Sequence, residues 1–432
     1  MAVQSGVAKL VAFKKEVTGL LMGIGATAST TGGMYLRRVT SDIDLSKDTF
    51  ESAEMRADYQ VGDFRHGMRK VGGTIKGELA PGSYDEFMAS ILRKVWSVAP
   101  APTMAALTVT TTATTGTYTL TRGAGSFLTD GVKIGHVLRI GTGTAVSSTD
   151  LNKNLFVVGV SATTLTVIPR DGLMTPTAAS TVTFVTTGIG KYVWTPTTGH
   201  VNDSYSIEHF YDDIDKSELF TGCRVNSVAL GLPATGIATC DVNFVGAGFN
   251  EGFTGTVGAP AYGTFAGASQ YFTSPTAANT AGLLTAVAGV LTTTVSGTST
   301  KIATITGLTI DVQGGMTTGA VVGSNLTPDV FAGRVKVTGQ LTAYFDSITM
   351  RDYFVNETPF GINVVMYSDS TIGSKFISLS LPYCKANGAT KTDGEQGLTM
   401  TIPFAALFNP VATDVSDPGL MTTMMIQDSD AT

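Results

Sequence analysis

The chain is poor in charge, in cysteine and in long apolar runs. Only 14% of its 432 residues are charged, against about a quarter in an average globular domain, and the net charge is −6. This acidic balance argues against a nucleic-acid binder that neutralises phosphates with Lys and Arg. No apolar run approaches the roughly 18 residues that a membrane-spanning helix needs, so we predict no membrane insertion.

The sequence also lacks the motifs of catalysis and of metal binding. Cys223, Cys240 and Cys384 form no Cys-x-x-Cys motif, and we expect buried thiols, with a Cys223–Cys240 bridge across a hairpin as the alternative. The four histidines are scattered, and the Asp-rich residues 212–215 lack the Gly and terminal Glu of a calcium loop. No Gly-x-Ser-x-Gly motif or P-loop occurs. We therefore predict a protein that is not an enzyme and has no cofactor and no metal.

The abundant residues are Thr and Gly, with 67 threonines and 50 glycines. Thr is β-branched and favours strands, whereas Gly marks turns, so the composition predicts an all-β protein. A chain with 43% hydrophobic residues and few charges is not intrinsically disordered. Such a composition also indicates that much of the surface is covered by other subunits, and we expect an oligomer.

An internal repeat extends over much of the chain. Residues 63–75 align with residues 329–341 without a gap at an offset of 266, and Asp, Gly, Lys-Val and Gly coincide. At the same offset residues 83–88 align with residues 349–354, and both stretches predict a short helix that buries aromatic residues behind a Ser or Thr N-cap. Ordered landmarks at one offset favour a duplicated domain.

Further landmarks flank this alignment. Upstream, residues 42–45 resemble residues 309–312 at an offset of 267. Downstream, two alternating strands that end in Leu-Pro, residues 225–233 and 376–382, are each followed by a turn and a returning strand, which predicts a hairpin in each copy. Because this last offset is 149, we expect the first copy to contain 266 − 149 = 117 additional residues.

The additional residues are typical of a separate β module, because they are rich in Thr, poor in charge and divided by turn residues. Its strands are expected at residues 117–121, 136–140, 154–160, 164–169 and 181–185. The predicted fold class is all-β with short flanking helices: an internally duplicated β-sandwich or barrel-like domain, plus a small inserted all-β module. The expected division is a discontinuous first domain at residues 1–96 and 200–250, the inserted module at 97–199, a Gly-, Ala- and Thr-rich connection at 251–300 and a second domain at 301–432.

Acidic residues concentrate in two segments. The first contains Asp42, Asp44, Asp48, Glu51, Glu54 and Asp58, and the second contains Asp203, Glu208, Asp212, Asp213, Asp215 and Glu218. Most such runs are solvated faces. In a ring of subunits, however, inward-facing copies would repel a polyanion passing through. We therefore regard the first set as candidates for contacts between subunits or rings, and the second as candidates for an acidic channel lining or interface.

Six short segments then occur in a characteristic order. They are SDIDLSKD (41–48), DFRHG (63–67), GTIKGELAPGSY (73–84), FTGCRV (220–225), LPATG (232–236) and YFTSP (271–275). In this order they resemble the tail tube, or major tail, proteins of long-tailed bacteriophages. The resemblance covers most of the chain outside the inserted module, and it rests on structural rather than catalytic signatures.

The resemblance implies a structural virion protein that polymerises as stacked rings and forms the hollow tail tube through which DNA is delivered. Known tube rings contain six domains, so a duplicated chain implies a ring of three chains with pseudo-sixfold symmetry, with six chains as the alternative. The implied partners are the chain itself, the tape measure protein, the tail terminator and tail tip proteins, and double-stranded DNA in transient, non-specific passage. The expected location is the phage tail, assembled in the host cytoplasm.

Two further expectations concern the kind of tail and the competing functions. An inserted module inside the tube would block DNA and one outside would clash with a contractile sheath, so we expect an outward module and a non-contractile, siphophage-like tail. A tail distal or baseplate hub protein of the same fold is one alternative function. A bacterial cell-surface adhesin-like protein is another, although no disulfide or sorting signal supports it.

Overall fold

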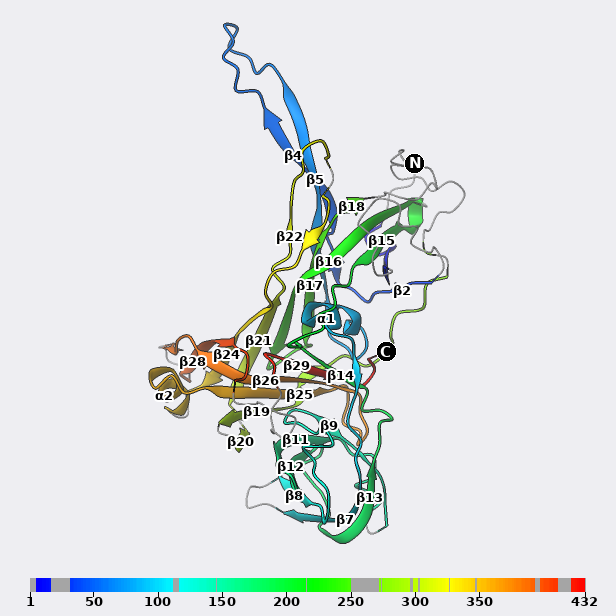
Figure 1. Cartoon of the computed structure of the whole chain (residues 1–432), viewed down its shortest axis with the longest axis vertical. Coiled ribbons are helices and arrows are strands. Elements are labelled where there is room, and N and C mark those ends of the chain that lie inside the picture. Colours follow the sequence, from blue (N-terminus) through cyan, green and yellow to red (C-terminus); the bar gives the residue numbers. More distant parts are fainter. Residues whose placement is uncertain are drawn as a thin grey trace.

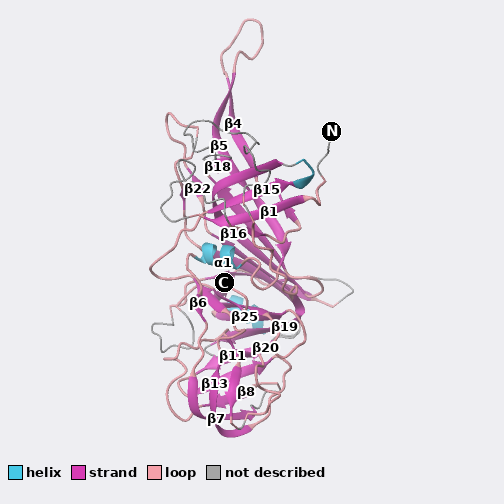
Figure 2. Cartoon of the chain, turned by 90° about the vertical axis from the view of Figure 1, so that its right-hand side faces the viewer, coloured by secondary structure: helices cyan, strands magenta, loops and turns pink. Residues whose placement is uncertain are grey.

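The computed structural model describes residues 5–16, 32–111, 116–144, 146–214, 216–249, 272, 274–295, 298–301, 304–325, 327–345, 348–392, 397–410 and 421–431. These residues form an elongated molecule of antiparallel β-sheets (Figures 1 and 2), with two short α-helices, α1 (Asp85–Leu92) and α2 (Thr349–Val355), and a 3₁₀ turn, η1 (Asp212–Ile214). The all-β prediction with short flanking helices is confirmed. Among the described residues, no helix is both long and apolar enough to cross a bilayer.

The first copy is a two-layer unit built on one long strand, β16 (Lys216–Pro233). The first half of β16 pairs with β15, which pairs with β1, and its second half pairs with β17, which pairs with β5 and then with β3 and β4. Helix α1 packs against β16. The remaining strands are β1 (Lys9–Lys15), β2 (Met34–Tyr35), β3 (Thr40–Ser41), β4 (Asp44–Glu51), β5 (Phe64–Glu78), β15 (Tyr205–Tyr211), β17 (Thr239–Gly246) and β18 (Gly248–Phe249).

The second copy repeats these pairings. Strand β19 pairs with β25, and β25 pairs with β26. Strand β28 pairs with β26 and β27 on one side and with β24 on the other. Strand β24 pairs in turn with β21. Its strands are β19 (Thr285–Val295), β20 (Thr298–Lys301), β21 (Ile305–Gln313), β22 (Thr317–Thr318), β23 (Val330–Phe331), β24 (Lys336–Tyr344), β25 (Phe360–Tyr367), β26 (Phe376–Ala386), β27 (Thr390–Lys391), β28 (Thr399–Ala406) and β29 (Met425–Asp428).

The strand registers reproduce the offsets of the sequence repeat. Ser41 pairs with Ile75 in the first copy, and Leu308 pairs with Leu341 in the second. The differences are 308 − 41 = 267 and 341 − 75 = 266, which are the offsets found in the sequence. Strands β5 and β24 also end at equivalent residues, 78 and 344. The duplication is therefore visible in the hydrogen-bonded pairing as well as in the sequence.

The downstream half of the repeat differs from the Leu-Pro alignment. Ile207 pairs with Phe220, and Ile362 pairs with Leu381, and in both copies a β-bulge precedes this pair. Strand β15 therefore corresponds to β25 at 362 − 207 = 155, and β16 corresponds to β26 at 381 − 220 = 161. The offset of 149 is wrong by twelve residues, and the additional length of the first copy is 266 − 155 = 111 residues, not 117.

The two copies join into one continuous sheet. The second half of β16 lies between β17 of its own copy and β21 of the other, with Ser227 opposite Gln313 and Pro233 opposite Gly307. The order β4-β5-β17-β16-β21-β24-β28-β27 then forms an antiparallel sheet of eight strands. A single apolar core packs against one face of this sheet and contains residues of both copies, such as Phe244 and Phe404.

The additional residues of the first copy contain a separate seven-stranded sheet in the order β10-β13-β7-β8-β12-β11-β9. All five expected strands are present. Two differences remain: β7, which begins at residue 103, was not expected, and the expected strand 136–140 is divided into β9 and the start of β10. The strands are β7 (Thr103–Thr111), β8 (Tyr118–Thr121), β9 (Val137–Leu138), β10 (Ile140–Gly143), β11 (Leu155–Val160), β12 (Thr164–Pro169) and β13 (Thr177–Phe184). We call residues 103–184 the inserted module.

Two short strands connect the inserted module to the body. Strands β6 (Ser97–Val98) and β14 (Lys191–Trp194) pair with each other, and β14 also pairs with the C-terminal strand β29. Strand β29 pairs in turn with β26 of the second copy. The C-terminal segment therefore holds together the base of the module and the second copy, which lie next to each other in Figures 1 and 2.

Candidate interaction surfaces

One face of the eight-stranded sheet is apolar and the other is polar, because side chains alternate along each strand. In β21, Leu308, Ile310 and Val312 are buried in the core, while the alternate residues Thr309 and Gln313 are exposed and Asp311 is half-buried. Strands β17 and β28 show the same alternation over eight residues each. The alternation leaves a continuous polar face that extends across both copies, and we call it the polar face.

The polar face has charges of both signs and many short side chains. Lys76 lies directly opposite Asp241 in the pairing of β5 with β17, and Asp241 lies opposite Ala229 of β16. On the other side of β16, Ala229 faces Asp311. The remaining positions are mostly Thr, Ser, Asn and Gln, as at Thr338 of β24. This surface has neither the clustered Lys and Arg that hold phosphates nor an aromatic stacking platform.

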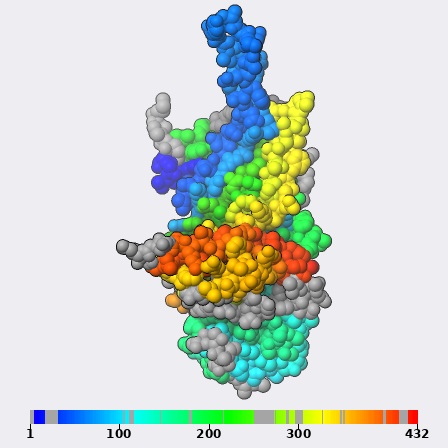
Figure 3. All heavy atoms as spheres, turned by 90° about the vertical axis from the view of Figure 1, so that its left-hand side faces the viewer, coloured from blue at the N-terminus to red at the C-terminus, as the bar shows by residue number. Residues whose placement is uncertain are grey.

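A long hairpin projects from one end of the molecule. It consists of the distal part of β4, residues 52–63 and the start of β5 (Figures 1 and 3). We call residues 48–66 the arm. Met55 and Tyr59 are fully exposed, and Phe50 is 60% exposed. Exposed apolar side chains concentrated on one projection are typical of a contact site rather than of a solvated loop.

The first acidic set lies along the arm and its base. Asp48 forms an ion pair with Lys70 at 2.7 Å, and Arg56 donates two hydrogen bonds to Asp58. The hydrogen bonds from Arg56 lower the pKa of Asp58. Asp42 accepts a hydrogen bond from the Thr74 amide, and Asp44, Glu51 and Glu54 are exposed. These acids were expected from the sequence, but the exposed apolar residues of the arm were not. Their only signal in the sequence is that several large apolar side chains occur within a charged stretch: Phe50, Met55, Tyr59, Val61 and Phe64.

The second acidic set is divided between the interior and the surface. Glu208 is fully buried and accepts hydrogen bonds from the Ser217 hydroxyl (2.5 Å) and the Phe272 amide (3.0 Å). These contacts hold the carboxylate inside the fold. Asp203 forms an ion pair with Lys15 at 2.7 Å, and Glu218 accepts a hydrogen bond from Tyr211. Asp212 and Asp213 are exposed in η1, and Asp215 lies outside the described residues.

The inserted module is docked firmly on the outer face of β25 and β26. These strands are buried on both faces, with one face in the main core and the other in a second core that includes Phe156 and Val158 of the module. The Arg139 guanidinium donates hydrogen bonds to the carbonyls of Gly373 (3.0 Å) and Ser374 (2.9 Å). Buried polar contacts of this kind fix the module to the second copy, even though it is inserted in the first.

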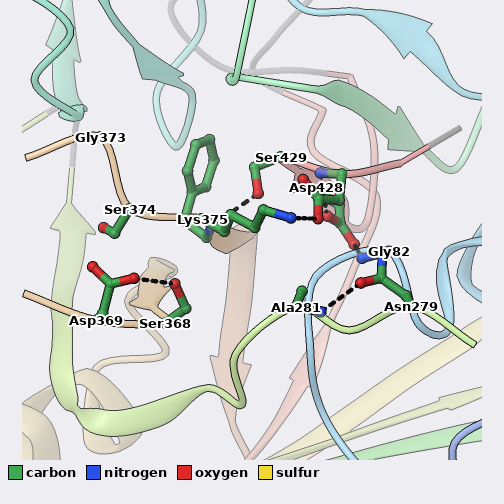
Figure 4. A network of polar contacts seen from close by, with 12 residues as sticks. Gly82, Asn279, Ala281, Ser368, Asp369, Gly373, Ser374, Lys375, Asp428 and Ser429 are labelled. Carbon is green, nitrogen blue, oxygen red and sulfur yellow. Dashed lines mark hydrogen bonds and ion pairs between the residues drawn. The ribbon is translucent and has the colours of Figure 1, made fainter. Parts of the chain in front are cut away.

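A buried carboxylate links the C-terminal strand to the first copy. Asp428 accepts hydrogen bonds from the amides of Gly82 (2.8 Å) and Asp430 (2.9 Å), next to the Lys375–Asp430 ion pair (Figure 4). Burial raises the pKa of Asp428 to about 8. Neighbouring Gln427 bonds to the backbone of Val137 in the module. The network therefore joins three parts of the chain.

The three thiols and two of the four imidazoles are buried inside the fold. Cys223, Cys240 and Cys384 are free and buried, so the expectation of buried thiols is confirmed and a Cys223–Cys240 bridge is not formed. Burial lowers the pKa values of His136 and His209 to about 3. In the described part of the chain, no group of three or more His, Cys, Asp or Glu is arranged to hold a metal ion.

Comparison with known proteins gives the chain its family. The model of a family described as phage tail tube protein matches residues 6–406. Among solved structures, one similar chain comes from the six-fold symmetrised cryo-EM structure of the anti-feeding prophage baseplate, with 14% identity over 27% of this chain and 86% of that one, at a TM-score of 0.22. No curated protein matches. This family consists of structural, non-enzymatic components of the virion's tail, so the expectation that the protein is not an enzyme is confirmed and the adhesin alternative is set aside. Because the match covers almost the whole chain, the chain belongs to the phage tail tube protein family.

Proposed function

We propose that three chains close into a ring of six equivalent domains, and that stacked rings form a tube whose channel is lined by the polar face. The observation that supports the ring most directly is the eight-stranded sheet, in which the chain already joins two equivalent domains edge to edge through β16 and β21. A sheet closed on itself has no free edge left to recruit other chains. Two domains per chain and six per ring require three chains.

The polar face suits the wall of a channel for DNA. Its charges of both signs, such as Lys76 opposite Asp241, leave no strongly positive stripe to bind phosphates. Short Thr, Ser and Asn side chains keep the wall hydrated and free of large protrusions. The duplex can therefore slide without being held. The same wall accommodates the tape measure protein before DNA passes, and tail terminator and tail tip proteins cover the two ends of the tube.

The arm connects stacked rings. It projects from the body with Met55 and Tyr59 fully exposed, so burial of these side chains on a neighbouring ring would be favourable. The flanking acids at the base of the arm, Asp42, Asp44 and Asp48, lie at the edge of the sheet and contact the adjacent subunit. Of the second set, the exposed Asp212 and Asp213 remain candidates for an interface.

The inserted module points away from the channel. The polar face, the main core, the β25–β26 layer and the module follow one another in that order, because β25 faces the core with Ile362 and Val364 and faces the module with Val365 and Tyr367. A decorated outer wall leaves no room for a contractile sheath, so the tail is non-contractile. The domain division proposed for the assembled tube is a first domain at residues 1–96 and 200–250, the module at 97–199 between its two parts, and a second domain at 301–432 that is completed by β19 and β20.

Electron microscopy of the polymerised protein tests this proposal. We expect hollow, stacked rings with threefold symmetry and six domain-sized densities per ring, with the modules outside. Six complete chains per ring would overturn the threefold arrangement. A single ring that does not stack would favour the alternative of a distal or hub protein, and the number of copies per virion distinguishes that alternative independently.

A further inference from the structure

The two outer strands of the eight-stranded sheet are equivalent to the two strands that join the copies inside the chain. At an offset of 161, the second half of β16 corresponds to the segment that contains β27. Pairing with the neighbouring strand supports this correspondence. Ala229 lies opposite Asp241, and Thr390, which is 229 + 161, lies opposite Thr401. Asp241 and Thr401 are themselves equivalent, because they pair with Lys76 and Thr342, which are 266 residues apart. At an offset of 267, β21 corresponds to residues 40–46 in β3 and β4.

The backbone groups on these outer strands have the orientation that a further strand needs. The Thr392 amide donates to the Thr399 carbonyl. The amide and carbonyl of the preceding residue, Lys391, therefore point away from β28. The Asp42 amide donates to the Thr74 carbonyl, so those of Ile43 point away from β5. Both edges therefore direct hydrogen-bonding groups outward.

We propose that β27 of one chain pairs antiparallel with β3 and β4 of the next chain in the ring, in the register that joins β16 to β21 within the chain. The intrachain pair Leu230–Ile310 becomes Lys391 opposite Ile43, because 230 + 161 = 391 and 310 − 267 = 43. In the same way, Ala229–Asp311 becomes Thr390 opposite Asp44. The partner is thus a second copy of this chain, added head to tail.

Two independent features of the edges agree with this register. It places Lys391 and Ile43 directly opposite each other, and the backbone amide and carbonyl of both residues point outward. It also places Thr390 and Asp44, which are both exposed, on the polar face, where the hydroxyl can donate to the carboxylate. A shift by one residue would turn each strand's exposed side chains into the core.

The side chains at this junction differ from those at the junction inside the chain. Lys391 occupies the place of the buried Leu230, and its ammonium lies 3.6 Å from the Phe345 ring centroid. The facing edge contains Asp42 and Asp44, whose side chains lie on the polar face while Lys391 lies on the core side. Opposite charges therefore come within about one Debye length of each other, without direct contact, as the ring closes. Contacts between exposed charges are screened by salt. Closure between chains is therefore sensitive to salt. The β16–β21 junction is not, because it lies within one chain and its Asp311 faces the uncharged Ala229.

A cysteine pair tests the register, and it relies on the proposed ring. Thr390→Cys with Asp44→Cys places two thiols on opposite strands in a pair that exchanges no backbone hydrogen bonds, where Cα atoms are about 4.5 Å apart and a disulfide can form. We expect oxidation to convert most of the assembled chain into covalent multimers that end at a closed trimer on a denaturing gel. The native thiols are buried and do not compete.

Three controls make every outcome decisive. Ala229→Cys with Asp311→Cys is the equivalent pair inside the chain and should close without joining chains. Thr390→Cys with Ser46→Cys moves one partner by two residues, about 7 Å, and should cross-link poorly. Chains with either Thr390→Cys or Asp44→Cys alone, when mixed, should give dimers only. Tubes that form normally without the Thr390–Asp44 cross-link would overturn the register but not the tube function.

A backbone variant tests the same junction without cysteines. Lys391→Pro removes an amide that points away from β28, so the chain should fold and remain soluble but fail to form rings. Lys391→Ala keeps the amide and should still form rings, with a weaker dependence on salt. Rings that assemble as well with Lys391→Pro as with Lys391→Ala would contradict the proposed edge. If the wild-type chain itself formed no tubes, the proposed function would be contradicted instead.

Discussion

Phe87 and Tyr353 occupy equivalent places in the two copies. Their replacement by Ala should lower the free energy of unfolding by unequal amounts. They are related by the offset of 266, and their ring partners, Tyr205 and Phe360, by 155. The Phe87–Tyr205 rings lie 5.1 Å apart, edge to face, and the Tyr353–Phe360 rings lie 5.8 Å apart and stacked. The repeat has thus kept one aromatic contact between helix and sheet in two different environments.

The cost follows from what surrounds each ring. Phe87 is fully buried and also touches the rings of Phe13 (4.6 Å) and Phe244 (5.1 Å). Removing a buried Phe costs about 3–5 kcal/mol, and lost aromatic pairs add to this. Tyr353 is only partly buried at the edge of the core. We therefore expect Phe87→Ala to cost about 4 kcal/mol and Tyr353→Ala about 1–2 kcal/mol.

Urea unfolding of the unpolymerised chain at constant m-value measures both variants. The single core shared by the two copies predicts one transition for the domains, so the two free energies are directly comparable. Phe87→Leu serves as a control, because it keeps most of the apolar volume and should cost much less than Phe87→Ala. Equal costs for Phe87→Ala and Tyr353→Ala would refute the argument that α1, and not α2, closes the core.

Four further outcomes follow from the structure. Burial raises the pKa of Asp428 from its ordinary value of 3.8 to about 8. The contribution of this group to the free energy of unfolding is therefore complete below pH 4 and decreases as the pH rises toward 8, by up to about 1.4 kcal/mol per pH unit. Asp428→Asn should remove this pH dependence in denaturant titrations. Replacing both Met55 and Tyr59 by Ser should leave single rings that do not stack in electron micrographs, and normal tubes would contradict the role of the arm. Arg139→Ala should cost about 2–3 kcal/mol and expose the inserted module to limited proteolysis while rings still form. Cys384, whose pKa is raised by burial, should react with a thiol reagent only after unfolding, and rapid native labelling would contradict its burial.

The repeat was recognisable in the sequence where gaps were absent and side chains were distinctive. The offset of 266 between residues 63–75 and 329–341 relates β5 to β24, which pair with β3 and with β21 at equivalent residues. The five expected strands of the inserted module are also present. In both cases an alternating strand is bounded by Gly, Asn or Asp, and such turn residues act locally. Local chemistry was therefore sufficient to place these elements.

The Leu-Pro alignment failed for a physical reason. It placed Leu381 over Leu232, whereas the registers place it over Phe220, a difference of 161 − 149 = 12 residues. Since side chains alternate with a period of two, any even shift leaves the same face buried, and the hydrophobic pattern cannot distinguish the two alignments. Only pairing with β15 and β25, far away in the sequence, determines the register.

The interaction surfaces were predicted unequally. Acidic residues are conspicuous in a chain with few charges, so Asp42 and Asp44 were found, and they lie at the edge of the sheet. Glu208 belongs to the same kind of run but is buried, because Ser217 and the Phe272 amide supply partners that the sequence does not reveal. The exposed Tyr59 was missed, since a single aromatic residue in a loop has no periodicity to mark it as exposed.

Duplication explains why this chain can have features that six identical domains could not share. In the proposed ring the inserted module sits on β25 and β26, the outer layer of the second copy. It is anchored there by Arg139, and by Gln427 through the backbone of Val137. The equivalent layer of the first copy, β15 and the first half of β16, is covered instead by Phe272, which packs against Leu219 of β16. The arm has an equivalent in the second copy, the hairpin of β22 and β23, where Thr317 pairs with Phe331 as Phe50 pairs with Arg65. That second hairpin lies against β5 instead of projecting, because the Arg69 amide donates to the Asn325 carbonyl. If all six domains were identical, each would need both an arm and a module, and each module would have to dock on its own domain. With two unlike copies, the first can supply arm and module while the second supplies the docking surface, and both still present the same strand edges to close the ring.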